Sequence, residues 1–378
     1  MITSSPIRRA NARQCVLALR EAEDALTVGE ITADTGLSRP TVDAVLQDLL
    51  AAGTVLPAAA ATSGSAGRPA RRFAFAPGVG SVAALDIGAR SVRCLVTDAA
   101  GTPLARSAVA LAAEDPREDL ARAVRETGHA PRTLGVAVPG ILGADGRITQ
   151  SLAAPSLVGL DLVGGLGERL GCTVAVENDI KLAALAEHHL GPTADSIVLV
   201  QLGRRVSIAV IVEGAIWQGA HRLAGELGSQ RGMRWTASSE RGRLTWSTGE
   251  DARPLLERAA AGDPDARREI EEFCAEIAPR LATVLLTLDP ELVVVGGGLS
   301  RAGDTLLDPL RRALHRLLMT EHSPEVVGAR LTTDGALVGA LGLACSEGSA
   351  ELLGVPSVPA PWARLLTAAD PHPAKDIP

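Results

Sequence analysis

The stretch VAALDIGARSVRCLVTD, residues 82–98, predicts a strand, a glycine turn and a second strand, and the fold prediction starts from it. Apolar residues dominate both halves, and Gly88 interrupts them where the chain must turn. A further strand is expected near 104–110, a helix over 117–127 and a buried strand over 133–140. The region therefore predicts an α/β unit that begins with a β-hairpin.

The same order of elements recurs in the second half of the chain. SIVLVQL and SIAVIVEG, residues 196–202 and 207–214, predict a second hairpin, and a long helix is expected over 264–288. PELVVVGGGLS, residues 290–300, predicts a strand that ends in a triple-glycine turn, and a helix should follow at about 302–318. Two such units predict two lobes with a cleft between them, where small ligands usually bind.

Composition narrows the class of protein. The chain has 378 residues, of which 46% are hydrophobic and 21% charged, so disorder of the whole chain is excluded. Aromatic residues make up 2% with no Tyr, which argues against recognition by stacking. A net charge of −7 excludes a protein that coats nucleic acid or anionic membrane over its whole surface, but a local basic patch remains open. The five cysteines are far apart, which indicates buried thiols in a reducing compartment. Without an apolar leader or a membrane-length run, we expect a cytoplasmic protein and no membrane partner.

The first 78 residues predict a DNA-binding domain. Helices are expected over 8–21, within 28–37 and over 38–53, followed by a small, glycine-rich and basic segment, AAAATSGSAGRPARRFAFAP, at 58–77. The alternating FAFA is typical of a short strand, so this segment is interpreted as a β-wing. Residues 1–80 hold 8 Arg and no Lys against 7 Asp+Glu, with the cations at the two ends. That placement suits a small domain that touches an anion at two points.

The third helix has the start expected of a recognition helix. Ser38 is a good N-cap, and Pro40 is tolerated in the first turn. Short polar or cationic groups there would meet the major groove, and the wing arginines would enter the minor groove. An ordinary capped helix on a protein-binding domain and a solvated linker are the alternatives. The DNA-contact candidates are Ser38, Arg39, Pro40, Thr41, Arg68 and Arg71.

Several motifs in fixed order resemble a known family. They are Leu37 to Val42, Gly67 to Ala70, Gly135 to Gly140, Val176 to Asp179, Gly225 to Gly228, Asp289 to Glu291 and Val295 to Ser300. Over residues 8–350 the sequence resembles ROK-family (repressor, open reading frame, kinase) transcriptional regulators, a group that includes the xylose and N-acetylglucosamine repressors. The resemblance implies an α/β fold with an N-terminal winged helix-turn-helix and a two-lobed sugar-kinase/actin-type (ribonuclease-H-like) domain. We expect the domains to be 1–78, 79–350 and a Pro-rich tail, 351–378, with one short helix at most.

Two phosphate motifs depart from the family pattern. The Asp-x-Gly-x-Thr turn of the family kinases is Asp86-Ile87-Gly88-Ala89-Arg90 here. The second phosphate loop, normally a run of Gly and Thr, is Gly203-Arg204-Arg205-Val206-Ser207. Bare backbone N–H groups must approach phosphate closely, and side chains obstruct them. These departures predict a plain strand turn in a former ATP site, no catalytic residues, no cofactor and no enzyme.

The metal motif of the family is also incomplete. Its Glu-x-Gly-His ends here in Ser229, and residues 230–246 contain no Cys and no His. Structural zinc needs about four N or S ligands. The sequence therefore predicts no metal site.

A sugar-binding set remains. The resemblance assigns ligand contact to Gly140, Asn178, Asp179 and Glu226, and in the family's kinases the Asp matching Asp179 is the general base. Carboxylates also bind sugar hydroxyls without chemistry. The alternative for Asp179 is a helix N-cap, because a helix is expected over 179–190. Trp217, Trp235 and Trp246 could line a sugar pocket, although packing is the commoner role of such residues.

These inferences predict a DNA-binding transcriptional regulator, most simply a repressor, of carbohydrate-related genes. A catalytically inactive ROK domain would sense a sugar or sugar phosphate effector. A palindromic double-stranded DNA operator requires a homodimer or higher homo-oligomer. The alternatives are an ATP-dependent sugar kinase with a regulatory DNA-binding head, and a scaffold that has lost sugar binding.

Overall fold

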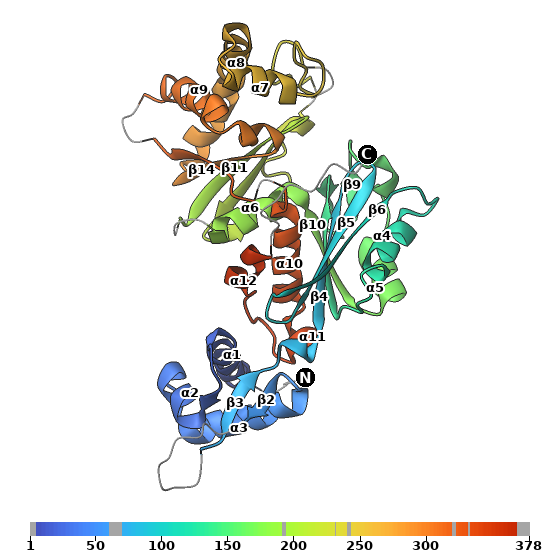
Figure 1. Ribbon diagram of the computed structural model, residues 1–378, viewed down its shortest axis with the longest axis vertical. Helices are drawn as coiled ribbons and strands as arrows, with labels where there is room; N and C mark the ends of the chain where they lie inside the picture. The colour runs from blue at the N-terminus through green and yellow to red at the C-terminus, as the bar shows by residue number, and fades with distance from the viewer. Residues whose placement is uncertain are drawn as a thin grey trace. The chain divides into compact units, whose positions relative to one another are not determined.

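The computed structural model of the chain describes residues 5–59, 70–190, 194–230, 232–239, 243–319, 323–331 and 333–368. The described residues form two compact units (Figure 1). Unit 1 contains those up to Val138 together with Ala153–Glu177 and Ala340–Ala368. Unit 2 contains Pro139–Leu152 and Asn178–Gly339. Each unit is therefore assembled from segments distant in the sequence.

The first part of unit 1, up to residue 76, is called the head. It holds three helices and a three-stranded sheet of order β1-β3-β2. The elements are α1 (Pro6–Glu21), β1 (Leu26–Thr27), α2 (Val28–Thr35), α3 (Arg39–Ala52), β2 (Val55–Ala58) and β3 (Arg72–Phe75). The helices were expected within a few residues of these bounds, whereas the two-residue strand β1 was not expected.

Local sequence signals explain the helix ends of the head. Thr27 and Glu30 form a capping box at the start of α2, and Gly36 ends this helix with φ +68°. Ser38 caps α3, as expected, because its Oγ accepts from the Thr41 backbone N–H at 3.4 Å. Gly53 ends α3 in the left-handed conformation. The segment 36–53 is thereby fixed at both ends by its own side chains and glycines.

The rest of unit 1 is built on a five-stranded sheet of order β10-β7-β4-β5-β6. Its strands are β4 (Ser81–Ile87), β5 (Ser91–Asp98), β6 (Pro103–Ala110), β7 (Thr133–Val138) and β10 (Thr173–Asn178), with helices α4 (Pro116–Arg125) and α5 (Leu162–Leu170). β4 pairs antiparallel with β5 and parallel with β7, so the sheet is mixed. The predicted hairpin at 82–98 is confirmed as β4 and β5.

Unit 2 contains a second mixed sheet of order β13-β12-β11-β14-β15. Its strands are β11 (Ser196–Leu202), β12 (Val206–Val212), β13 (Ala215–Ile216), β14 (Leu292–Gly296) and β15 (Glu325–Gly328), and a two-stranded ribbon pairs β8 (Ile141–Leu142) with β9 (Ile148–Gln150). The expected recurrence of a hairpin-first α/β unit is therefore confirmed.

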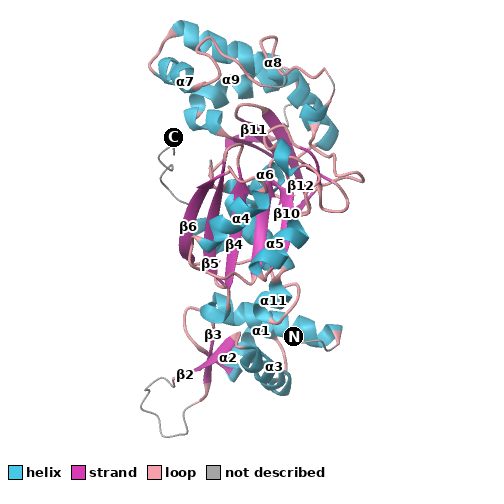
Figure 2. Ribbon diagram, turned by 90° about the vertical axis from the view of Figure 1, so that its right-hand side faces the viewer, coloured by secondary structure: helices cyan, strands magenta, loops and turns pink. Residues whose placement is uncertain are grey.

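Helices cover both faces of the second sheet (Figure 2). They are α6 (Asp179–Leu190), α7 (Arg253–Ala260), α8 (Pro264–Leu288) and α9 (Asp304–His315). Val198 and Val200 face the large core with α7, α8 and α9, whereas Ile197 and Leu199 face α6. The alternation follows from the two-residue period of a strand. The predicted bounds of the long helix, 264–288, are confirmed.

The C-terminal residues differ from the expected tail. α10 (Gly335–Glu347) is followed by α11 (Ser349–Leu353) and α12 (Trp362–Thr367). Leu352, Val355, Val358 and Leu365 are all at most 1% exposed. The segment up to Ala368 thus packs as part of unit 1, although its prolines break any helical period.

The cysteines agree with the expectation of buried thiols at four of five positions. All five cysteines are unpaired, and four of them are buried. Within the described ranges, no helix has the length and apolar character needed to cross a membrane.

Candidate functional site

The start of α6 is organised by Asn178. Its Oδ1 accepts from the backbone N–H groups of Ile180 and Lys181, each at 3.0 Å, and its Nδ2 donates to the carbonyl oxygen of Gly140 at 3.0 Å. Asn178 is 8% exposed, so these bonds lie in a buried setting. The helix cap is therefore Asn178, and Asp179 is the first helical residue. Asp179 is half-buried, and its Oδ1 accepts from Ile180 N at 2.9 Å.

Gly140 is required by its surroundings. A Cβ at this position would lie 2.4 Å from the carbonyl oxygen of Gln150, in the neighbouring strand β9. Ser151 donates to the carbonyl oxygen of Pro139, which fixes the same turn. Only glycine allows the Gly140 carbonyl to face the Asn178 amide at this separation. The structure therefore brings two of the predicted ligand residues into direct contact.

A buried lysine ties the loop before Glu226 to α6. Lys181 is 3% exposed, and its Nζ donates to the carbonyl oxygen of Arg222 at 3.2 Å. Gly225 has φ +83°, and a Cβ there would lie 2.2 Å from the carbonyl oxygen of Ile208 in β12. Glu226 follows directly and precedes the short 3-10 helix Leu227–Ser229. Gly140, Asn178, Asp179 and Glu226 are the residues predicted to contact a sugar and are hereafter called the sugar-contact cluster. All four belong to unit 2.

The turn between β11 and β12 borders a cavity of about 680 Å³, hereafter the turn cavity. Gly203 and Arg204 line it from the turn, Gly298 and Arg301 from the glycine-rich segment after β14, and Trp246 from a loop. Its remaining lining residues are Glu250, Asp251, Ala252, Arg253, Leu256, Glu257, Ala260, Leu299 and Ala302. The expectation of a plain turn missed this cavity.

The charges around the turn cavity are mixed. Arg253 pairs with Asp251 at 3.0 Å, and Arg243 pairs with Glu250 at 3.5 Å. Burial and the nearby Arg243 lower the pKa of Arg205. The wall therefore offers guanidinium groups for phosphates, carboxylates for hydroxyls, and the apolar Leu256 and Leu299 for a flat ring. This mixture fits a nucleoside phosphate.

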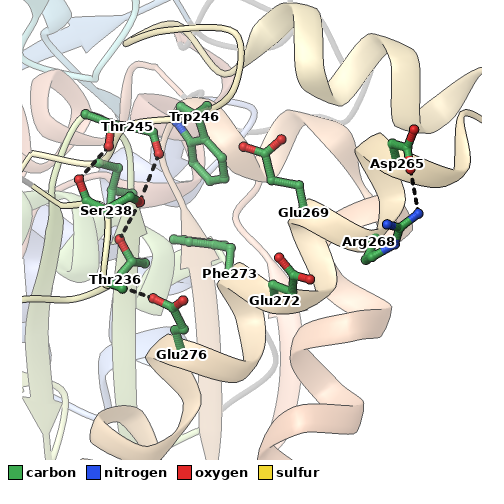
Figure 3. Close-up of a pocket in the computed structure, with 12 residues that line it drawn as sticks. Thr236, Ser238, Thr245, Trp246, Asp265, Arg268, Glu269, Glu272, Phe273 and Glu276 are labelled. Atoms are coloured by element: carbon green, nitrogen blue, oxygen red, sulfur yellow. Dashed lines mark hydrogen bonds and ion pairs between the residues drawn. The ribbon is translucent and has the colours of Figure 1, made fainter.

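A second cavity, of about 420 Å³, lies between α8 and the segments 236–238 and 244–246. Figure 3 shows Glu269, Glu272 and Glu276 projecting from α8 toward these segments. Glu276 accepts from the Ala237 backbone N–H at 2.6 Å, and Glu269 accepts from the Ser247 backbone N–H at 2.7 Å. Glu276 and Glu269 therefore hold the backbone at 237 and 247, on either side of residues that lack the metal ligands of the family motif. Trp246 borders both cavities, and Trp235 is 1% exposed.

The turn at 86–90 retains the Asp of the family motif, and this Asp86 forms an ion pair with Arg93. Asp86 lies opposite Arg93 in the β4–β5 register, and Arg93 Nη2 donates to Asp86 Oδ2 at 2.6 Å. Gly88 N donates to the carbonyl oxygen of Ser91 at 2.8 Å, which closes the turn. The Asp86 carboxylate is thus held by its own hairpin in unit 1.

Four of the six predicted DNA contacts lie at the start of α3. Ser38, Arg39 and Pro40 are exposed there, and Thr41 is half-buried with its Oγ1 2.8 Å from Ser38 Oγ. Arg71 is exposed beside β3, with its guanidinium carbon 5.4 Å from the centre of the Phe73 ring. Arg68 lies outside the described residues. The structure therefore leaves the α3 end accessible and tests none of these contacts.

That the chain binds no metal remains a prediction. Over the part of the chain that the structure describes, no three His, Cys, Asp or Glu side chains are grouped as a metal site would need. Metal analysis of the purified protein tests it.

The turn cavity is lined by a strand turn and a glycine-rich segment of a mixed α/β unit. Residues 82–233 and 229–347 match the ROK family, and the chain belongs to that family.

The relatives of this chain include a bifunctional enzyme and several sugar kinases. The bifunctional enzyme NanE/NanK of Brucella melitensis is 31% identical over 219 residues, which are 53% of this chain and 42% of that protein. The chain thus spans about two fifths of that bifunctional relative. The N-acetyl-D-glucosamine kinase of Yersinia pseudotuberculosis is 28% identical over 253 residues, which are 57% of this chain and 81% of the kinase.

Solved structures agree on the fold. A ROK hexokinase from Thermus thermophilus is 28% identical and matches with a TM-score of 0.59 over 71% of this chain and 99% of its own. A ROK family transcriptional regulator, a homologue of the E. coli MLC protein, is 16% identical, and it matches with a TM-score of 0.70 over 96% of this chain and 98% of its own. This likeness shows the fold of almost the whole chain.

The expectation of a protein without enzymatic activity is wrong. Relatives of this chain include an N-acetyl-D-glucosamine kinase and a glucokinase, and a ROK glucokinase of Streptomyces griseus shares the fold. Replacement of glycine by arginine at 204–205 was taken to close the phosphate site, but a cavity remains beside that turn. Its other lining residues come from 246–260 and 298–302, so no single motif could reveal it.

Proposed function

We propose that the chain is an ATP-dependent sugar kinase of the ROK family that carries a DNA-binding head. The observation that carries the kinase is the start of α6, where Asn178 is hydrogen-bonded to Gly140 and precedes Asp179, the residue that matches the family's general base in sequence. The turn cavity in the same unit supplies a place for the nucleotide. The relatives favour a hexose or an N-acetylated amino sugar as the second substrate.

The reaction transfers the γ-phosphoryl group of ATP to a sugar hydroxyl. Asp179 accepts the hydroxyl proton as the sugar oxygen bonds to phosphorus, and the bond to the β-phosphate oxygen breaks to leave ADP. Asn178 fixes the backbone of Asp179 through the Gly140 bond, which keeps the carboxylate in one orientation. Glu226 accepts hydrogen bonds from other sugar hydroxyls. Arg204 and Arg301 balance phosphate charge through side chains, where the family loop uses backbone N–H groups.

A coupled ADP-release assay tests the kinase. Purified protein is given ATP, magnesium and in turn N-acetyl-D-glucosamine, glucose, N-acetylgalactosamine and N-acetylmannosamine. Turnover with one of them is expected. Asp179→Asn should reduce kcat by 10²-fold or more, on the order of a lost general base. Asp304→Asn is the matched control, because Asp304 is also the first residue of a helix, α9, and it pairs only at the surface with Arg311. Equal rates for the two variants would remove Asp179 from the mechanism.

The second activity proposed is transcriptional regulation of carbohydrate-related genes by the head. It is supported by the α3 end with its exposed Arg39 and by the likeness in fold to a ROK transcriptional regulator. We assign the winged helix-turn-helix to 1–78 and the sugar domain to 79–350. A sugar or its phosphate is the effector, the protein acts in the cytoplasm, and a homodimer reads the two halves of a palindromic operator.

Operator binding is measured by fluorescence anisotropy on DNA from upstream of the gene. Specific binding should exceed that of a shuffled sequence by at least about 10³-fold at 150 mM salt. Adding the sugar identified by the kinase assay should change this affinity. Equal affinity for both DNAs would contradict the regulator while leaving the kinase standing.

A further inference from the structure

Residues 349–368, hereafter the strap, contact the head directly. Thr54 is fully buried just after α3, and its Oγ1 donates to the carbonyl oxygen of Leu353 at 2.7 Å. Gly354 has φ +69°, and a Cβ there would lie 3.2 Å from Ala52 Cβ. Figures 1 and 2 show α11 next to the helices of the head. The strap therefore holds the C-terminal end of the helix whose other end carries the DNA-contact candidates.

The strap is also fixed to the sheet of unit 1. Arg106 Nη2 in β6 donates to the carbonyl oxygen of Ala368 at 2.6 Å, and Arg132 Nη1 donates to that of Glu351 at 3.4 Å. Pro361 and Leu365 would lie 3.2 Å from a Cβ at Gly101. Anchors at both ends of the strap leave it little freedom to move independently of the sheet.

The second half of α10 packs against the strap and the head. A Cβ at Gly342 would lie 1.9 Å from Trp362 Cη2, so the indole rests on the backbone of α10. Arg20 of α1 is 7% exposed, and burial lowers its pKa. Cys345 in α10 and Arg364 in the strap lie near enough to influence the same pKa. Trp362 and Arg20 therefore make α10, the strap and α1 one packed assembly in unit 1.

The first half of α10 belongs to unit 2 and packs on α6. A Cβ at Gly339 would lie 2.0 Å from the carbonyl oxygen of Leu182, and one at Gly335 would lie 3.1 Å from Ala183 Cβ. Such backbone contacts cannot give way gradually, because neither partner has a side chain to rotate. Leu182 is three residues after Asp179. The helix α10 thus runs without a break from the sugar-contact helix to the strap.

We propose that α10 and the strap form a mechanical link that carries the occupancy of the sugar-contact cluster to α3. This link rests on the proposed sugar site and DNA-binding head. A shift of α6 on ligand binding moves the backbone of α10, because the two helices are in direct backbone contact. Trp362, which rests on α10, moves the strap in turn. The hydrogen bond between Thr54 and Leu353 then couples the strap to the end of α3. Packed elements of this kind switch between discrete arrangements.

The pair Thr54→Val and Thr32→Val isolates the joint with the head. Both changes replace a hydroxyl by a methyl in the head, but among the described residues Thr32 Oγ1 has no hydrogen-bond partner. Amide hydrogen exchange is followed in the full-length chain with and without N-acetyl-D-glucosamine and with and without glucose. Thr54→Val should speed exchange over 349–354 by about fivefold, the size of one lost hydrogen bond. Thr32→Val should not.

The change in amide exchange on adding sugar distinguishes a failure of the link from a failure of the proposed sugar site or DNA-binding head. In the wild type, a sugar that protects α6 should also change exchange over 49–54, and Thr54→Val should abolish only the change over 49–54 while that over 349–368 persists. Protection of α6 with no change in 349–368 overturns the link. No protection of α6 by either sugar refutes the sugar site for these sugars and the link with it. If the wild type binds no operator, the regulator fails, and the exchange pattern still decides the link.

Discussion

Gly225→Ala should displace Glu226, because the added methyl group would overlap the backbone of β12. Gly225 has φ +83°, and the new Cβ would lie 2.2 Å from the carbonyl oxygen of Ile208. A left-handed backbone costs a non-glycine residue about 1–2 kcal/mol. Relieving the overlap costs about 1–3 kcal/mol more, because both partners are main chain.

Gly232→Ala separates these two costs. Gly232 has φ +77°, close to that of Gly225, but no described atom lies within 4 Å of its added Cβ. Both variants therefore carry the conformational cost, and only Gly225→Ala carries the overlap. At about 2–4 °C per kcal/mol for a unit of this size, Gly225→Ala should melt about 2–12 °C below Gly232→Ala. Differential scanning fluorimetry gives the difference.

The sugar response of the two variants should also diverge. Gly232→Ala should keep the thermal stabilisation by the sugar substrate, and Gly225→Ala should lose most of it, because Glu226 is the next residue along the chain. Equal melting temperatures would refute the argument from the Ile208 contact. A lower melting temperature with an intact sugar response would remove Glu226 from the sugar-contact cluster.

Three other predictions concern acid stability, thiol reactivity and DNA. Burial alone would raise the pKa of Asp119, but hydrogen bonds from the backbone N–H groups of 113 and 112 and the charge of Arg122 lower it overall. Its contribution to stability is thus present above about pH 3.9 and is lost as pH falls through the lowered value, so Asp119→Asn should flatten the urea midpoint between pH 5 and pH 2. Burial raises the pKa of Cys94 to about 12 and that of Cys172 to about 11, so iodoacetamide at pH 8 should label the native protein far more slowly than the urea-unfolded protein. Arg39→Ala should weaken operator binding by about 1–3 kcal/mol if it reads a base edge, and an unchanged anisotropy titration would exclude that contact.

Elements with a strong local signal were predictable from the sequence. The hairpin at 82–98 consists of two mainly apolar runs interrupted at Gly88, and the helix at 264–288 has an apolar period of 3.6 residues. Ser38 and Gly53 mark the ends of α3 by their own chemistry. Asn178 and Gly140 were identified as ligand residues by resemblance, but their mutual bond could not be predicted because 38 residues separate them.

The misses share one physical cause, which is contact between segments distant in sequence. The segment after residue 350 looked like a tail because prolines remove periodicity, yet Val355 is fully buried and Leu353 accepts a hydrogen bond from Thr54, 299 residues away. The turn cavity was missed for the same reason. Arg204 suggested a blocked phosphate loop, and the wall opposite it comes from α7 and the segment after β14.

The common strand order of the two sheets places their first turns at equivalent positions. Numbered within its own unit, each sheet runs 3-2-1-4-5. In both sheets the first strand pairs antiparallel with the second and parallel with the fourth. The turns at 88–90 and 203–205 each join the first strand to the second, and each contains a glycine followed within two residues by arginine. The two departures from the family's phosphate motifs therefore lie at equivalent points of the two sheets.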